Sequence, residues 1–142
     1  MEARGPLVLV VDAEPDFLQS LEDVLKIYLP RLRLVAFTRA AAAFEFLEHA
    51  SVDLVIADYR LPGQDGLTFL QRVAERWPGT SLVLVSAFGQ GHLRRLIQGR
   101  DLDVRLWAKP FEVDRLVAQV QEALDHTAPA AIRPSRGPAA AP

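Results

Sequence analysis

Residues 52–66, VDLVIADYRLPGQDG, decide the fold of this chain. Residues 54–57 are a continuous apolar run, typical of a parallel strand covered on both faces, and the run stops abruptly at Asp58. Pro62 and Gly66 then keep the chain irregular before a helical stripe begins. Because loops at the carboxyl ends of strands in an open α/β sheet border a crevice that collects ligands, Asp58 is the first candidate for a reacting group. An aspartate here can equally serve only as a helix cap or turn former.

Length and composition bound the possible functions. The 142 residues suffice for one domain with its own core, and half of them are hydrophobic. A formal net charge of −2 predicts no direct binding to nucleic acid or to an anionic membrane. The absence of cysteine excludes disulfides and thiol chemistry. The apolar run before Asp12 is too short for a signal peptide or a membrane span, so a cytoplasmic location is expected.

Strand and helix signals alternate along the rest of the chain. Apolar, β-branched runs predict strands, and apolar residues at three- and four-residue spacing predict helices. Thr38 is expected to cap the second helix. The five βα units predict an α/β fold, a doubly wound five-stranded parallel sheet with helices on both faces. The expected strands are residues 7–11, 32–37, 54–58, 82–85 and 104–108, and the expected helices are residues 15–28, 39–48, 66–77, 92–98 and 113–124.

Polar side chains stand at the ends of four of these strands. Asp12 follows the first strand, Asp58 ends the third, and Ser86 and Lys109 follow the fourth and fifth. In a parallel sheet all four lie at one edge, so we expect them to converge. Asp58 is suited to form an aspartyl phosphate, and Asp12 to hold Mg²⁺. Lys109 would neutralise phosphoryl charge, and Ser86 would hydrogen-bond a phosphoryl oxygen. Singly, Lys109 could be a solvated charge and Ser86 a turn residue, but together they indicate a phosphoryl site.

The segments VVDAEPDF, VIADYRLPGQDG, LVLVSAF and WAKPF resemble the receiver domain of bacterial two-component response regulators. The resemblance covers roughly residues 6–126, and it implies a receiver domain at residues 1–126 with a flavodoxin-like sheet. It implies that Asp58 accepts a phosphoryl group from a histidine kinase or a phosphotransfer protein, with Mg²⁺ as cofactor. Such a domain is a signalling relay rather than an enzyme, although it assists its own phosphorylation and dephosphorylation.

The other motif residues take roles from the same resemblance. Asp12 matches the first member of the family's acidic pair, a metal ligand together with the acceptor. Arg60 matches the residue whose backbone carbonyl is a further metal ligand. Ser86 matches the hydroxyl that turns toward the phosphoryl group, and Lys109 the amine that pairs with it. Pro110 matches a proline whose preceding peptide bond is commonly cis in this family.

One departure concerns the metal site. The second place of the acidic pair, which binds Mg²⁺ directly in the family, is Ala13 in this sequence. A unit charge about 4 Å from another contributes roughly 4 kcal/mol gross at an effective dielectric near 20, so its loss should weaken Mg²⁺ binding. Glu14 either compensates by reaching the metal or is a first-turn acid favoured by the helix dipole.

The second departure concerns the switch. Three residues before the lysine the family usually carries a tyrosine or phenylalanine, and Leu106 stands there instead. Strand alternation sends the adjacent Trp107 to the opposite face, where we interpret it as core beneath the first and fifth helices. Signalling is then expected to run through altered packing of the fourth helix, fifth strand and fifth helix, the elements expected to form any homodimer.

Residues 127–142 are rich in alanine and proline, which predicts a disordered tail or the start of a linker.

Three functions are considered for the whole chain. The first is a phosphorylatable receiver, and the second is a pseudo-receiver that acts as a phosphorylation-independent protein-interaction module because Ala13 has cost it the metal. The third, an enzyme or flavin-binding module of similar fold, is disfavoured because the first βα turn, DAEPDF, has no glycine-rich phosphate loop.

Overall fold

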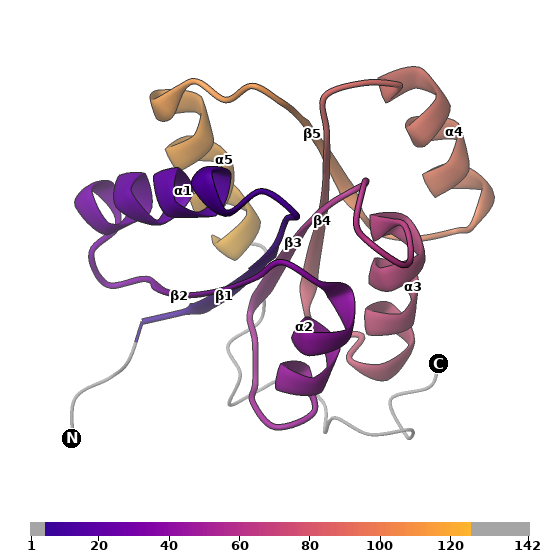
Figure 1. Ribbon diagram of the computed structural model, residues 1–142, viewed down its shortest axis with the longest axis horizontal. Helices are drawn as coiled ribbons and strands as arrows, with labels where there is room; N and C mark the ends of the chain where they lie inside the picture. Colours follow the sequence, from indigo (N-terminus) through magenta and orange to yellow (C-terminus); the bar gives the residue numbers. More distant parts are fainter. Residues whose placement is uncertain (1–4, 126–142) are drawn as a thin grey trace.

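The computed structural model describes residues 5–125, in which strands and helices alternate (Figure 1). The strands are β1 (Leu7–Val11), β2 (Arg33–Phe37), β3 (Leu54–Asp58), β4 (Ser81–Ser86) and β5 (Arg105–Ala108). The helices are α1 (Pro15–Tyr28), α2 (Ala40–Leu47), α3 (Gly66–Arg76), α4 (Gln90–Gly99) and α5 (Val113–Asp125). These bounds agree with the predicted elements to within a few residues.

All five strands belong to one parallel sheet with the order β2-β1-β3-β4-β5. The order reverses beside β1, because β2 lies on one side of β1 and β3 on the other. The predicted doubly wound, flavodoxin-like sheet is therefore confirmed. In such sheets the crevice beyond the carboxyl ends of the strands, at this point of reversal, is the place where ligands bind.

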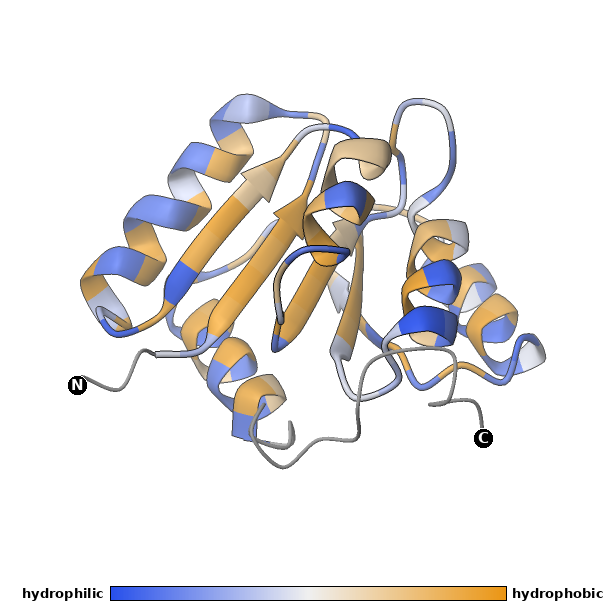
Figure 2. Ribbon diagram, turned by 90° about the horizontal axis from the view of Figure 1, so that it is seen from below, coloured by the Kyte–Doolittle hydropathy of each residue, from blue (hydrophilic) through white to orange (hydrophobic). Residues whose placement is uncertain are grey.

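Helices α1 and α5 cover one face of the sheet, and α2, α3 and α4 cover the other (Figure 1). The sheet can carry helices on both sides because the interiors of its central strands are apolar, with polar residues only at strand ends, as Figure 2 shows. On the first face the stripe Leu18, Leu21 and Leu25 of α1 joins Leu116 and Val120 of α5 in one core. The helices turn their polar residues mostly to the outside, so each face of the sheet is covered by an apolar core.

Strand β5 places its two large residues on opposite faces, as alternation predicts. Trp107 is buried in the core formed with α1 and α5, and its ring meets that of Phe111 edge-on at 6.2 Å. Leu106 packs partly buried against the core of α3 and α4. The interpretation of Trp107 as core beneath the first and fifth helices is therefore confirmed.

Two local predictions need correction. Thr38 does not cap the second helix, because α2 begins at Ala40 and its N-cap is Arg39, with no side-chain cap hydrogen bond. Helix α4 begins at Gln90, two residues before the expected start. Gly89 adopts φ +71°, which a glycine tolerates, and so turns the chain directly into the helix where a looser loop was expected.

No helix within residues 5–125 is long and apolar enough to cross a membrane. The alanine- and proline-rich segment 127–142 lies outside the described residues. Its assignment as a tail or linker, separate from a domain at 1–126, therefore stays a prediction.

Candidate functional site

Two carboxylates stand side by side at the carboxyl edge of the sheet. Val11 of β1 pairs with Ala57 of β3, so the next residue of each chain segment, Asp12 and Asp58, occupies neighbouring positions. Asp12 is only 2% exposed, and its Oδ1 accepts a hydrogen bond from the Glu14 backbone N–H at 2.9 Å. The register of the two central strands thus forces a pair of acids together at one end of the sheet.

The amine of Lys109, from the end of β5, joins this pair. Its Nζ donates to Oδ2 of Asp12 at 2.6 Å and lies 3.1 Å from Oδ1 of Asp58. The same Nζ lies 4.0 Å from the ring centroid of Phe17 in α1, a cation–π distance. The peptide bond between Lys109 and Pro110 is cis, as the family resemblance implies. Two carboxylates and one aromatic ring therefore surround the single positive charge of Lys109.

Burial and charge shift the acid–base properties of this cluster. Burial raises the pKa of the Asp58 carboxyl above its ordinary value, and the neighbouring charge of Asp12 acts in the same direction, while the hydrogen bond from Lys109 opposes both. Burial by itself lowers the pKa of Lys109, but hydrogen bonds and charge attraction from the two aspartates outweigh it, and the net effect raises that pKa. Lys109 therefore stays protonated beside a partly exposed carboxylate that is more basic than usual.

Ser86 lies at the same edge, but its hydroxyl is engaged by its own loop. The side chain is buried, with its Oγ–H donating to the Phe88 carbonyl at 2.6 Å and its Oγ accepting from the Phe88 N–H at 3.2 Å. The Ser86 carbonyl accepts from the Lys109 backbone N–H at 3.1 Å. The structure thus ties the backbone of Ser86 to Lys109 and directs its hydroxyl to Phe88.

The segment before α1 carries the residues that differ from the family pattern. Ala13 is exposed beside Asp12, and it adds no carboxylate. Glu14 takes the N-cap position of α1 without a side-chain cap bond. Its carboxylate is largely exposed and lies 3.9 Å from the Lys109 amine. Glu14 thus faces the cluster from its rim, as a weak partner of Lys109.

The loop after β3 contacts both the carboxylate and the backbone carbonyl of Asp58. The Arg60 N–H donates to Oδ2 of Asp58 at 3.0 Å. Gly66 donates its N–H to the Tyr59 carbonyl at 2.7 Å, and a Cβ at Gly66 would collide with the Asp58 carbonyl oxygen. Glycine is therefore required where α3 begins. The loop thereby orients one carboxylate oxygen of Asp58 while leaving the other to Lys109.

The donor set tests whether the implied magnesium ion fits. Within residues 5–125 no group of three or more His, Cys, Asp or Glu side chains is arranged to hold a metal ion. Mg²⁺, however, is commonly held by one or two carboxylates, with waters and phosphate oxygens completing its shell. Asp12 and Asp58 meet that smaller requirement. The site fits a hydrated Mg²⁺ and does not fit an all-protein metal cage.

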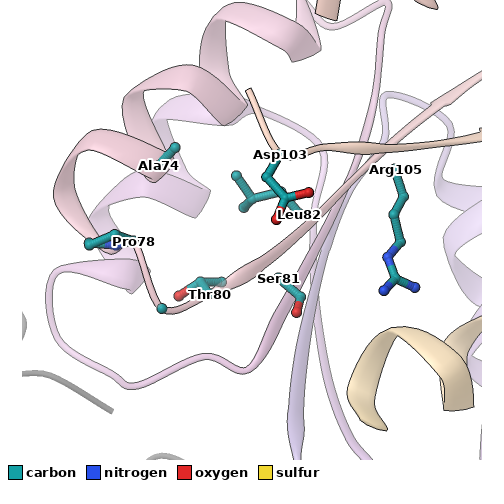
Figure 3. Close-up of a pocket in the computed structure, with 8 residues that line it drawn as sticks. Ala74, Pro78, Thr80, Ser81, Leu82, Asp103 and Arg105 are labelled. Carbon is teal, nitrogen blue, oxygen red and sulfur yellow. The ribbon is translucent and has the colours of Figure 1, made fainter. Parts of the chain in front are cut away.

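A separate hollow opens at the opposite, amino-terminal ends of β4 and β5 (Figure 3). The Thr80 hydroxyl donates to the Val52 carbonyl at 3.2 Å, and the Ser81 hydroxyl approaches the Ala123 carbonyl at 3.4 Å. These hydroxyls tie neighbouring segments together at the end of the sheet opposite to Asp12 and Asp58. The lining residues are Ala74, Pro78, Gly79, Thr80, Ser81, Leu82, Asp103 and Arg105.

The sequence patterns did not identify two aromatic side chains that lie near Asp58 and Lys109, at the carboxyl edge of the sheet. Phe17 belongs to the predicted apolar stripe of the first helix, yet its ring packs against the Lys109 amine. Phe88 stands in the loop after β4, is 69% exposed, and lies 5.7 Å from the Arg60 guanidinium carbon. The one available signal for Phe88 was a large apolar residue between a strand end and a glycine.

Comparison with known proteins places this geometry in a family. The family model for the response regulator receiver domain matches residues 8–121. The chain therefore belongs to the response regulator receiver domain family. The family acts in two-component signalling, its members interact with histidine kinases or phosphotransfer proteins, and it implies phosphorylation on an aspartate with Mg²⁺.

Individual relatives agree with this assignment. The response regulator protein PilR of Pseudomonas aeruginosa is 34% identical over 121 residues, which cover 82% of this chain and 25% of PilR. The C4-dicarboxylate transport transcriptional regulatory protein DctD of Rhizobium meliloti is 29% identical over 122 residues, 85% of this chain and 26% of DctD. The chain thus spans about a quarter of these curated relatives. The solved signal receiver domain of an HD domain-containing protein from Pseudomonas fluorescens Pf-5 matches with a TM-score of 0.77 and 28% identity, covering 89% of this chain and 91% of that one.

Proposed function

We propose that this chain accepts a phosphoryl group on Asp58 from a histidine kinase or a phosphotransfer protein. One observation carries the proposal: the Lys109 amine lies within 3.1 Å of carboxylate oxygens of both Asp12 and Asp58. An Asp58 oxygen would form the new bond to phosphorus as the bond between phosphorus and the donor's histidine nitrogen breaks, with the electron pair leaving on that nitrogen. Water attack on the aspartyl phosphate would later release inorganic phosphate.

The residues around Asp58 would divide the work of this transfer. Lys109 holds the carboxylate and offers a positive charge to the incoming phosphoryl oxygens. Ser86 would exchange its hydrogen bond to Phe88 for one to a phosphoryl oxygen. Asp12, Asp58 and the backbone carbonyl of Arg60 would hold Mg²⁺, with Glu14 as a further candidate at the rim. Bound Mg²⁺ supplies charge neutralisation at the phosphoryl oxygens.

Two substitutions should make this receiver unusual. Ala13 removes the carboxylate that binds Mg²⁺ directly in the family, so metal affinity should be reduced. Leu106 removes the aromatic ring that usually moves inward on activation, so the switch should differ in this chain. Both features are proposals about this chain that rest on its sequence and on the site geometry.

The test is phosphorylation by a small donor. The protein is incubated with acetyl phosphate, with and without Mg²⁺, and its intact mass is measured. We expect a Mg²⁺-dependent gain of one phosphoryl group that Asp58→Asn abolishes and the matched control Asp101→Asn, at an exposed turn far along the chain, retains. A gain that persists in Asp58→Asn would assign the acceptor to another residue.

A pseudo-receiver is the second candidate, and Ala13 is the observation that favours it. In that case the fold serves as a phosphorylation-independent interaction module. Absence of any adduct at high Mg²⁺, together with absence of beryllofluoride binding, would select this function over the first.

The remaining assignments are also proposals. We infer a cytoplasmic signalling protein that is no enzyme on external substrates and that makes no direct contact with nucleic acid. Any homodimer would form through α4, β5 and α5. Analytical ultracentrifugation with and without beryllofluoride tests this, and a monomer in both states would refute the dimer.

A further inference from the structure

A closed series of contacts joins Asp58 to Ser86 through two surface residues. The Arg60 backbone N–H donates to Asp58 Oδ2 at 3.0 Å. The Arg60 guanidinium lies 5.7 Å from the centroid of the Phe88 ring, within the range of a cation–π contact. The Phe88 backbone shares two hydrogen bonds with the Ser86 hydroxyl, at 2.6 and 3.2 Å. The acceptor and the hydroxyl on the next strand are therefore linked by an Arg60–Phe88 clasp.

The clasp lies on the surface and contributes little to the core. Phe88 is 69% exposed and belongs to neither hydrophobic core, and Arg60 is exposed as well. Gly89 follows Phe88 with φ +71°, so the loop turns sharply into α4 at that point. Phe88 is thus held by the Arg60 guanidinium at its ring and by the Ser86 hydroxyl at its backbone.

Phosphorylation removes both of these restraints at once. A serine hydroxyl has a single proton, so Ser86 cannot donate to the Phe88 carbonyl and to a phosphoryl oxygen together. A phosphoryl group on Asp58 also brings negative charge and acceptor oxygens beside Arg60, and a guanidinium prefers such oxygens to an aromatic face. Both changes release Phe88.

We propose that the Arg60–Phe88 clasp is the phosphorylation readout of this receiver. It is closed in the unphosphorylated protein, and it opens when Ser86 and Arg60 turn to the phosphoryl group. The freed Phe88 ring then reports the state of Asp58 at the surface. The proposal rests on the proposed function, and it supplies an aromatic reporter in a chain whose β5 position carries Leu106.

Two-dimensional NMR of the full chain tests the clasp, with beryllofluoride and Mg²⁺ as the probe. The Tyr59 amide, next to the acceptor, reports binding. In the wild type we expect the Phe88 amide and the Arg60 Nε–H resonances to shift by several linewidths on binding. In Phe88→Leu, which keeps an apolar side chain without the ring, the Arg60 Nε–H of the free protein should be displaced from its wild-type position, because the ring that it faces is gone.

Ser86→Ala tests whether Phe88 responds to the probe through the Ser86 hydroxyl or only because it lies near the bound probe. Without the hydroxyl, the free protein should show a displaced Phe88 amide, and the probe should shift it less than in the wild type, because only the Arg60 contact is left to change. An equal probe-induced shift of the Phe88 amide in Ser86→Ala and in the wild type would overturn the proposal, as would an Arg60 resonance unchanged in Phe88→Leu. If the Tyr59 amide shifts and Phe88 does not, the clasp alone is refuted. If the wild-type Tyr59 amide also stays fixed, the proposed function fails with it.

Discussion

The amine of Lys109 lies 2.6 Å from Oδ2 of Asp12, across 97 residues of sequence. It also lies 3.1 Å from Oδ1 of Asp58, so one ammonium group screens two carboxylates that would otherwise repel each other. The Lys109 and Asp12 side chains are almost fully removed from solvent. This arrangement should make the Lys109–Asp12 pair a source of stability, which substitution can test.

Lys109→Met should destabilise the protein by about 3 kcal/mol at neutral pH, because removing one partner of a buried ion pair leaves the other charge unpaired. Methionine keeps much of the apolar stem, so the loss reports the charge. Urea unfolding measures the difference. Lys26→Met is the matched control, since Lys26 is exposed and 3.8 Å from Glu22; it should cost less than about 0.5 kcal/mol. Equal losses in the two variants would contradict the role given to Lys109.

Asp58→Asn should be more stable than the wild type at neutral pH. Burial raises the pKa of Asp58, so the folded protein binds this proton more tightly than the unfolded chain does. Stability linked to the protonated form is fully present below the unfolded pKa and is lost as the pH rises through the folded pKa. Above that pH the ionised carboxylate costs the fold free energy, and asparagine removes this cost.

The advantage of Asp58→Asn should disappear in acid, where the wild-type carboxyl is neutral in both states. Thermal melts of the two proteins across the acidic and neutral range measure the gap. A difference in melting temperature that stays constant with pH would contradict this cost of ionising Asp58 in the folded protein. A variant that melts below the wild type at neutral pH would contradict it as well.

Much of the fold and of the acidic cluster follows from simple patterns in the sequence. The apolar runs predict parallel strands, and the carboxyl ends of parallel strands share one edge. That rule alone brings Asp12, Asp58 and Lys109 together, as the structure confirms. Their roles in phosphoryl transfer stay predictions, because the positions of these residues show that they lie close together and do not show which reaction they carry out.

Other features depend on torsion angles that periodicity does not encode. The Ser86 hydroxyl turns to the Phe88 carbonyl, a choice made by one side-chain rotation. Thr38 has the right chemistry for a cap but lies one residue too early, since Arg39 precedes the first residue of α2. The early start of α4 depends on the φ of Gly89. Short polar motifs therefore predict which residues meet more reliably than how they are oriented.

Trp107→Ala should cost about 3–5 kcal/mol, because Trp107 is buried in the core with α1 and α5 and would leave a large cavity. Leu106→Ala should cost about 1–2 kcal/mol, since Leu106 is only partly buried against the opposite core. Urea unfolding measures the free energy of both variants. The transition is monitored by far-ultraviolet circular dichroism, because that signal does not depend on the indole that Trp107→Ala removes. A larger loss for Leu106 would contradict the assignment of the two faces of β5.

Ala13→Asp should strengthen Mg²⁺ binding. Ala13 is exposed beside Asp12, so a carboxylate fits there without disturbing the core. A unit charge about 4 Å away contributes roughly 4 kcal/mol gross near the surface. Desolvation and side-chain ordering offset part of it, and a net gain of about 1.4 kcal/mol lowers the Kd about tenfold. Calorimetric titration with MgCl₂ measures the change.

The charge-matched control is Ala41→Asp, in the exposed first turn of α2, where an acid is also favoured by the helix dipole. If the gain in Ala13→Asp comes from direct metal ligation, Ala41→Asp should leave the Kd for Mg²⁺ close to that of the wild type. The gain should also persist at raised salt, since screening weakens a distant charge more than a ligand in contact with the metal. Equal affinities in the two variants would contradict the proposal that Ala13 lowers the affinity of this site for Mg²⁺.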